Sequence, residues 1–113
     1  MADLERLFAG SRFIAGGDLN SSLLFDASRP GKTANADLFA NLAEAGFVDL
    51  RTPFFEEEQR TWFRPGDRHF QLDHVYADAE TATAISSWRV VLEAVEREPP
   101  LSDHAPIELI LAD

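Results

Sequence analysis

The sequence predicts one α/β (α+β) domain whose second half is a mostly antiparallel sheet. Its 113 residues suffice for a single hydrophobic core, and 45% of them are hydrophobic. Two segments with a helical spacing of apolar residues lie in the first half of the chain. Short apolar runs separated by turn-rich or charged pieces follow them. We therefore treat residues 1–113 as one domain or a part of one.

The first half is predicted to run helix, strand, helix. Apolar residues at positions 4, 7 and 8, followed by Gly10, predict a short amphipathic helix over residues 2–9. Residues 13–16 are apolar or small and predict a buried strand. A second helix is predicted over residues 35–45, ending at Gly46, which suits a left-handed cap. Its apolar stripe consists of Leu38, Phe39, Leu42 and Ala43.

The second half is predicted to consist of short strands. Turn signals such as Arg64-Pro65-Gly66-Asp67 separate them. Because such strands follow one another through short connections, antiparallel pairing is expected. The predicted strands cover residues 47–50, 61–64, 71–77, 84–92 and 106–111.

Composition narrows the classes of function. Ten Lys and Arg residues against 20 Asp and Glu residues give a net charge of -10, which argues against tight non-specific binding to a nucleic-acid backbone. A small or locally held phosphate ligand remains compatible with this charge. The chain has no cysteine, so disulfides and thiolate metal sites are excluded. No membrane span or signal peptide is indicated, and a cytoplasmic protein is the expectation.

The stretch FIAGGDLNSS places Asp18 and Asn20 directly after the first predicted strand. If the extended backbone continues, both side chains project from one side of the strand end, a position where α/β sheets commonly bind ligands. The alternative is an Asx turn without further function. An EF-hand loop is excluded because Leu23 and Arg29 stand where that loop needs Gly and Glu.

The stretch PPLSDHAPIEL sets Asp103 beside His104 before the last predicted strand. Prolines at positions 99, 100 and 106 restrict the backbone here, which favours one geometry for the pair. A carboxylate beside an imidazole suits divalent-metal binding and acid–base chemistry. A purely structural loop pair is the alternative.

Asp73 lies within the apolar strand QLDHVYAD, where an unpaired carboxylate would be costly to bury. It therefore needs a partner, and His104 is the best candidate. The alternative is that Asp73 reaches solvent. His69 and His74 have no zinc-site spacing and are expected at the surface or in packing. No serine lies in a nucleophile elbow, so a serine hydrolase is disfavoured.

Read together and in this order, GGDLN, RTW, QLDHVYAD and LSDHAPIEL resemble the C-terminal motifs of the endonuclease/exonuclease/phosphatase superfamily. The resemblance covers residues 4–111. It implies the C-terminal half of a DNase-I-like four-layer α/β sandwich, with mostly antiparallel sheet and two helices. It also implies hydrolysis of a phosphodiester or phosphomonoester, nuclease activity included, with Mg²⁺ or Mn²⁺ as cofactor.

The resemblance further implies a role for each motif residue. Asp18 would activate the attacking water, and Asn20 would hold a phosphate oxygen. His104 would contact the phosphoryl oxygens while Asp73 orients it, and Asp103 would help to bind the metal. These roles suit the residue types, since carboxylates bind hard cations and a protonated imidazole stabilises a developing dianion. Thr61 and Trp62 are expected to pack beside the site.

The sequence departs from the family pattern in one large respect. Family members have an N-terminal half that supplies an asparagine and the main metal-binding glutamate, and neither motif is present here. We therefore expect a C-terminal portion of a longer enzyme, weak or inactive alone, that pairs with the missing half or with a second copy. The alternative is a catalytically inactive binding or self-associating module. The substrate is expected to be a phosphate ester, and the charge does not indicate nucleic acid.

Overall fold

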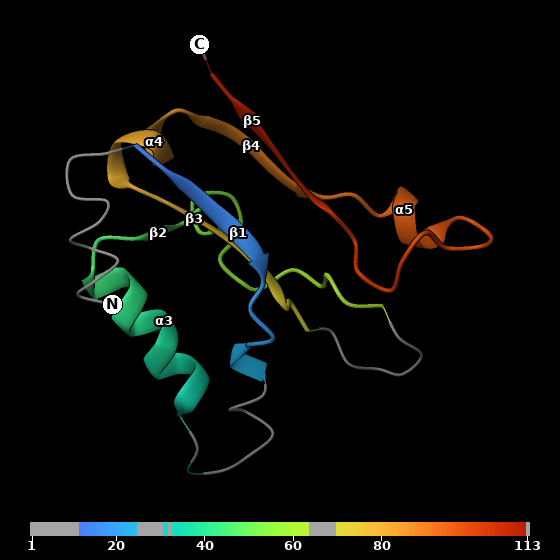
Figure 1. Ribbon diagram of the computed structural model, residues 1–113, viewed down its shortest axis with the longest axis horizontal. Helices are drawn as coiled ribbons and strands as arrows, with labels where there is room; N and C mark the ends of the chain where they lie inside the picture. The colour runs from blue at the N-terminus through green and yellow to red at the C-terminus, as the bar shows by residue number, and fades with distance from the viewer. Residues whose placement is uncertain (1–11, 25–30, 32, 64–69, 113) are drawn as a thin grey trace.

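A computed structural model describes residues 12–24, 31, 33–63 and 70–112 of the chain. The predicted helix over residues 2–9, the predicted turn at 64–67 and His69 lie outside these residues. Helices are interspersed between the strands of the described chain, except that β3 follows β2 directly (Figure 1). Their bounds are β1 Ile14–Asp18, α3 Ala34–Glu44, β2 Val48–Asp49, β3 Asp73–Ala77, α4 Ala79–Thr83, β4 Ile85–Val90, α5 Glu93–Glu96 and β5 Ile107–Leu111.

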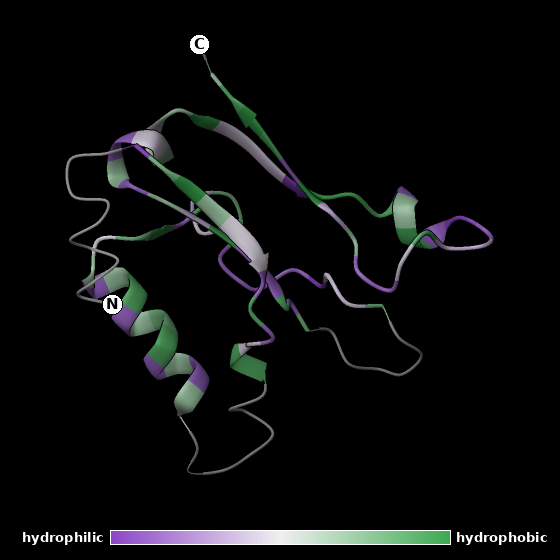
Figure 2. Ribbon diagram, viewed as in Figure 1, coloured by the Kyte–Doolittle hydropathy of each residue, from purple (hydrophilic) through white to green (hydrophobic). Residues whose placement is uncertain are grey.

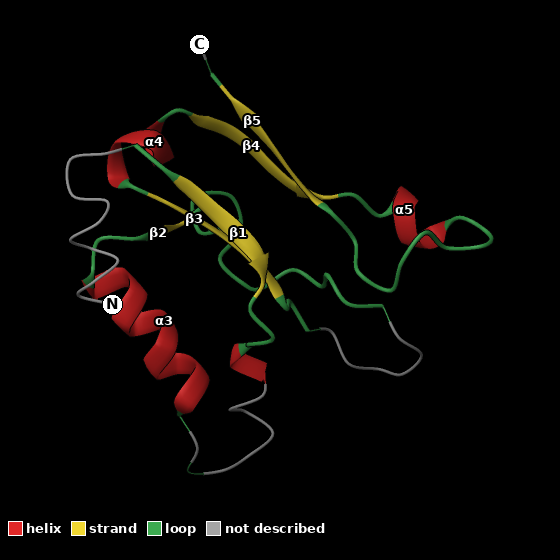
Figure 3. Ribbon diagram, in the orientation of Figure 1, coloured by secondary structure: helices red, strands yellow, loops and turns green. Residues whose placement is uncertain are grey.

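All strand pairs of these elements are antiparallel, as predicted for the second half of the chain. One sheet has the order β1-β3-β2, and β4 and β5 form a separate pair. An isolated bridge between Trp62 and His104 connects the segment before β3 with the segment before β5. Figure 3 shows the β1-β3-β2 sheet between helix α3 and the β4–β5 pair. The fold is thus a mixed α+β arrangement.

Helix α3 covers nearly the predicted range and ends as predicted at Gly46. Gly46 has a φ of 92°, and its N–H donates to the carbonyl of Ala43. The next N–H, from Phe47, donates to the carbonyl of Leu42 at 3.0 Å. These two bonds form a Schellman motif, which needs a left-handed residue at this position. The helix shows alternating hydrophilic and hydrophobic bands in Figure 2, consistent with one face packed on the sheet.

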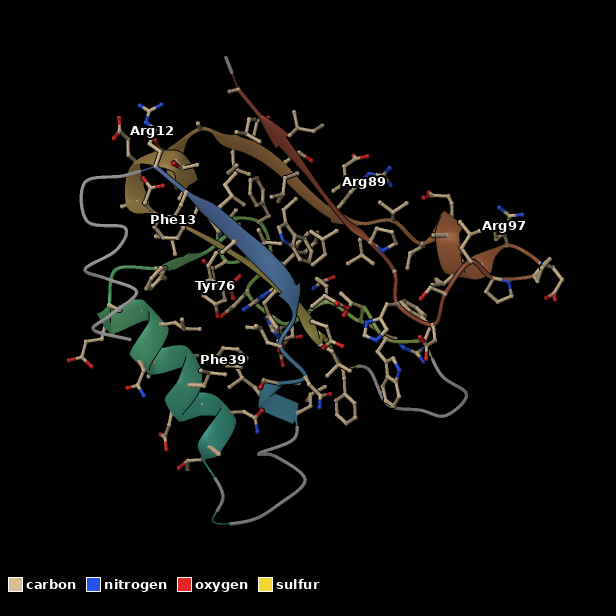
Figure 4. The ribbon with its side chains drawn as sticks, in the orientation of Figure 1. Arg12, Phe13, Phe39, Tyr76, Arg89 and Arg97 are labelled. Atoms are coloured by element: carbon tan, nitrogen blue, oxygen red, sulfur yellow. The ribbon has the colours of Figure 1, made fainter. Side chains whose placement is uncertain are left out.

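Strand β3 is the central strand, and its two faces pack against different elements. His74 and Tyr76 face helix α3, and the His74 ring lies 5.0 Å from the ring of Phe39. In Figure 4, Phe39 and Tyr76 both lie between α3 and the sheet. Ala77 on the opposite face belongs to the buried core, with Val75 packed against it. That core consists of Leu50, Ala77, Ile85 and Trp88.

The carboxylate of Asp78 holds the edge strand β1 of the first sheet and also caps helix α4. Asp78 accepts hydrogen bonds from the N–H of Thr81 at 3.0 Å and from the N–H of Phe13 at 2.8 Å. The first bond caps helix α4 and the second fixes the start of β1. The side chain of Thr81 is the largest cause that lowers the pKa of Asp78 to about 2, and the N–H groups of Phe13 and Thr81 add to it.

Two predicted strands differ from the observed elements. The strand predicted over residues 84–92 ends at Val90, because Leu92 begins the short helix α5. The strand predicted over residues 61–64 is reduced to an isolated bridge at Trp62. The backbone there divides its hydrogen bonds between two neighbouring segments. Thr61 and Trp62 donate to the carbonyl of Phe70 on one side, and Ala105 donates to the carbonyl of Thr61 on the other. Helices α4 and α5 were not predicted.

The molecule is flat, with extents of 44 × 42 × 22 Å. The strand predicted at residues 13–16 forms, but the prediction that it is buried is wrong: all five residues of β1 are exposed, because this edge strand packs little apart from its pairing with β3. Ile14 in β1 and Ile110 and Leu111 in β5 are 43 to 50% exposed. No described helix has the length and apolar character of a membrane span.

The core assignment is tested by truncating one leucine. Leu50 is 1% exposed, so Leu50→Ala should lower the free energy of unfolding by about 2–5 kcal/mol in urea titration. Leu101→Ala is the matched control, because Leu101 is 68% exposed, and a change within about 0.5 kcal/mol is expected. Equal losses in the two variants would contradict this core.

Candidate active site

Pairing of β1 with β3 places Asp18 directly opposite Asp73. The N–H of Leu19 donates to the carbonyl of Leu72 at 2.9 Å, which makes Asp18 and Asp73 a non-hydrogen-bonded pair. Side chains of such a pair lie on one face of the sheet, with Cβ atoms about 4.5–5.5 Å apart. Two carboxylates at this spacing repel each other unless a cation or a proton lies between them.

His104 supplies that cation. Its Nδ1 lies 2.8 Å from Oδ2 of Asp73, and its Nε2 lies 3.8 Å from Oδ2 of Asp18. The contact expected from the sequence between Asp73 and His104 is therefore present. A ligand atom from each of the three side chains lies within 4.8 Å of the others. The residues are 31 to 86 positions apart in sequence, and they share one site because β1, β3 and the segment before β5 converge.

The two carboxylates favour the protonated imidazole. The hydrogen bond to Asp73 is the main cause that raises the pKa of His104 above 6.5, and the charges of Asp73, Asp18 and Asp103 add to it. Partial burial opposes the shift but does not reverse it. A cationic, oriented N–H donor thus faces the open side of the site. Such a donor can stabilise negative charge on a bound oxyanion.

Asn20 occupies an unusual backbone position at the end of β1. Its φ is 50°, and its N–H donates to Oδ1 of Asp18 at 2.7 Å. This is an Asx turn, so that interpretation of the Asp-Leu-Asn stretch is also correct. The turn uses one oxygen of Asp18 and leaves Oδ2 directed toward His104. Asn20 itself is exposed, with its side chain available at the same strand end.

Asp103 is exposed and is not one of the three grouped residues. Its carbonyl accepts from the N–H of Phe63 at 2.6 Å, which fixes the backbone next to His104. Asp18, whose side chain is 48% exposed, offers a carboxylate oxygen to a hard cation, and ligand atoms of Asp73 and His104 lie within 4.8 Å of it. One oxygen of Asp73 is bound to His104. Carboxylate oxygens suit a divalent cation, and this group would fill only part of its coordination shell.

A second network, missed in the sequence, holds the loop that carries Asn20. His74 is 2% exposed, and its Nε2 lies 2.8 Å from the carbonyl oxygen of Ser21. Its Nδ1 lies 3.3 Å from Nε2 of the fully buried Gln71. The amide nitrogen of Gln71 can only donate, so Nδ1 of His74 accepts from it, and Nε2 of His74 donates to the carbonyl oxygen of Ser21. His74 was expected at the surface or in packing, and it is packed beside Phe39; its hydrogen bond to the Ser21 carbonyl was not predicted.

Glu58 anchors the next residues of the same loop. Its Oε1 accepts from the hydroxyl of Ser22 at 2.8 Å and from the N–H of Leu23 at 2.9 Å. Ser22 is fully buried, and its N–H donates to Oδ1 of Asn35 at the start of α3. The loop after β1 is therefore fixed from the helix side while its Asp18 and Asn20 end stays exposed.

A pocket of about 400 Å³ adjoins the three grouped residues. It is formed by β1, β3 and the segment before β5, and its lining includes Asp73, His104, Ala105, Pro106 and Ile107. Two glycines, Gly16 and Gly17, form the β1 wall and add no side chain to it. The volume is in the range of small-molecule sites.

Solved structures of known proteins have a similar fold. The 3′ phosphatase NExo from Neisseria, in a variant bound to a product DNA hairpin, superposes with a TM-score of 0.77 and 24% identity. That match covers 97% of this chain and 49% of NExo. The fold is similar to about half of NExo. The structure described as the 3′-5′ exonuclease NExo from Neisseria meningitidis gives a TM-score of 0.74 and 25% identity, over 96% of this chain and 48% of NExo.

The chain thus spans about half the length of NExo in either structure. The chain matches no protein-family model and no curated protein sequence. The likeness to NExo supports a nuclease-like fold, as the motif order predicted.

The Asp73–His104 contact makes stability depend on pH. A pKa raised in the folded state means that the contact stabilises fully below about pH 6.5, the unfolded value, and that this stability is lost as pH rises through the folded pKa. The difference in unfolding free energy between wild type and Asp73→Asn should therefore shrink from about pH 6 to about pH 9. NMR titration should also give a lower pKa for His104 in the variant.

Glu108→Gln is the control for this pH dependence. Glu108 forms an exposed pair with Arg89, and neither group titrates in that interval. If the difference in unfolding free energy between wild type and Glu108→Gln varied with pH as strongly as that between wild type and Asp73→Asn, the assignment to His104 would be contradicted.

The loop anchor is tested at His74. His74→Leu leaves the Ser21 carbonyl without its donor and should cost about 1–3 kcal/mol of unfolding free energy, with faster amide exchange at residues 20–22. His74→Gln can place an amide N–H near the position of Nε2 and should retain part of both. If the two variants lose equal stability and protection, the hydrogen bond to Ser21 is not the anchor.

Proposed function

We propose that this chain is the C-terminal portion of a metal-dependent phosphoesterase of the endonuclease/exonuclease/phosphatase superfamily. The observation that carries the proposal is the grouping of Asp18, Asp73 and His104 on one face of the sheet, beside a pocket. Four motifs resemble that superfamily in order, and the fold is similar to half of a protein described as a 3′ phosphatase and a 3′-5′ exonuclease. The proposed reaction is hydrolysis of a phosphate ester.

The proposed chemistry assigns one task to each residue. Asp18 accepts a proton from water as the water oxygen bonds to phosphorus and the bond to the leaving oxygen breaks. His104 donates from Nε2 to a phosphoryl oxygen as negative charge develops there, and Asp73 holds the imidazole through Nδ1. Asn20 donates its amide to another phosphoryl oxygen. Asp103 would help to hold a divalent cation, which would supply further charge neutralisation.

The flat shape supports the proposal that the chain forms half of a sandwich. A thickness of 22 Å leaves room for about two layers, since packed layers are about 10 Å apart. An exposed β1 and the half-exposed Ile110 and Leu111 are the surface that a further layer would cover. In this proposal, the missing half of the sandwich would carry the metal-binding glutamate that has no match in this chain.

The same exposed apolar residues favour a second candidate, an inactive module that binds a copy of itself or another chain. In that case the site residues would persist without turnover. The two candidates differ in whether His104 and Asp103 are needed for hydrolysis.

Hydrolysis of a DNA hairpin with a 3′ phosphate and of an aryl phosphodiester, with Mg²⁺ or with EDTA, tests the proposal. Turnover by the chain alone is expected to be slow, to require the metal, and to fall about 100-fold or more in His104→Ala and Asp103→Asn. Glu44→Gln is the charge-matched control, since Glu44 is an exposed residue of α3 remote from the site in sequence.

Equal rates in wild type and His104→Ala, or full activity in EDTA, would overturn the proposed mechanism. Absence of turnover in wild type, together with self-association in sedimentation, would favour the inactive module instead.

A further inference from the structure

Trp62 lies opposite His104 across an isolated antiparallel bridge. The N–H of Phe63 donates to the carbonyl of Asp103 at 2.6 Å, and the N–H of Ala105 donates to the carbonyl of Thr61 at 2.7 Å. These bonds flank Trp62 and His104, which are therefore a non-hydrogen-bonded pair. Their side chains project from the same face of the sheet, with Cβ atoms about 4.5–5.5 Å apart. The indole is the side-chain neighbour of the imidazole that faces Asp18.

The backbone of Trp62 is held in place from several sides. Its N–H donates to the carbonyl of Phe70 at 3.3 Å, and its carbonyl accepts from Nε of Arg60 at 2.9 Å. The preceding residue, Thr61, is fully buried, and its hydroxyl accepts from the N–H groups of Leu72 and Asp73. Trp62 is therefore tied to the same strand that positions Asp73.

The indole ring also has a fixed orientation. It stacks on the ring of Phe70, with centroids 6.1 Å apart and planes 13° apart. Phe70 is 6% exposed, whereas Trp62 is only partly buried. The chain's other tryptophan, Trp88, is 3% exposed and belongs to the core. A rigid, partly exposed aromatic ring beside a phosphate-binding residue is the arrangement that binds a nucleobase by stacking.

We propose that Trp62 forms a stacking surface for the nucleobase of the nucleotide whose phosphate lies at His104. This inference rests on the proposed function and narrows its substrate class to nucleotides and nucleic-acid ends, as opposed to phosphate esters without a base. The net charge of -10 does not favour contacts to a phosphate backbone, but it leaves an uncharged stacking contact with one base unaffected. Stacking contributes affinity with any base.

Binding of two probes measures the contribution of the base. Thymidine 3′-monophosphate carries a base and glycerol 3-phosphate does not. Wild type should bind the nucleotide about 5- to 150-fold more tightly, which corresponds to the stacking of one base. Trp62→Leu should bring this ratio close to one. Trp62→Phe keeps an aromatic ring and should retain part of the preference, so it also controls for loss of folding in Trp62→Leu.

Tryptophan fluorescence locates the contact. In Trp88→Phe the remaining tryptophan is Trp62, and nucleotide binding should quench its emission. In Trp62→Phe the remaining tryptophan is the buried Trp88, and the same nucleotide should leave its emission unchanged. A base preference that survives in Trp62→Leu, or quenching confined to Trp88, would overturn the inference.

The outcome also separates this inference from the proposed function. Binding of both probes with equal affinity, lost in His104→Ala, would keep the phosphoesterase proposal and reject the stacking surface. Failure of wild type to bind either probe would reject both.

Discussion

The arrangement of this site depends on the antiparallel pairing of β1 with β3. That pairing brings Asp18 and Asp73 to adjacent positions on one face, where their charges repel. The protonated His104 removes the conflict by contacting one carboxylate and approaching the other. Both carboxylates raise the pKa of His104, with the hydrogen bond to Asp73 as the main cause, and the same bond fixes the orientation of the imidazole.

The long elements of this fold could be predicted from the sequence because their signals are local. Helix α3 has four apolar residues at helical spacing and a glycine where the chain must turn left-handed. Strand β3 has Leu72 before Asp73 and the apolar residues Val75, Tyr76 and Ala77 after it. The short helices α4 and α5 span five and four residues, too few for a periodic pattern. Only the capping residue Asp78 signals α4, and its importance becomes clear from its bond to Phe13.

The site was predictable to the extent that its residues carry ionisable groups in unusual surroundings. Asp73 in an apolar strand requires a partner, and His104 meets that requirement. His74 could not be found in this way, because its partner is a backbone carbonyl, a group that every residue has. Trp62 was expected only to pack, since the bridge that sets it beside His104 joins segments more than 40 residues apart. The metal-binding role predicted for Asp103 stays a prediction.

Gly16 gives the spacing of the two carboxylates a simple origin. A Cβ atom at this position would lie 3.1 Å from a methyl group of Val75 and 3.2 Å from the carbonyl oxygen of His74. A side chain there would need Val75 or the β3 backbone to shift by a few tenths of an ångström, in the part of the sheet that sets the distance between Asp18 and Asp73. The position of Asp18, the proposed general base, thus depends on a glycine two residues before it that takes no part in the chemistry.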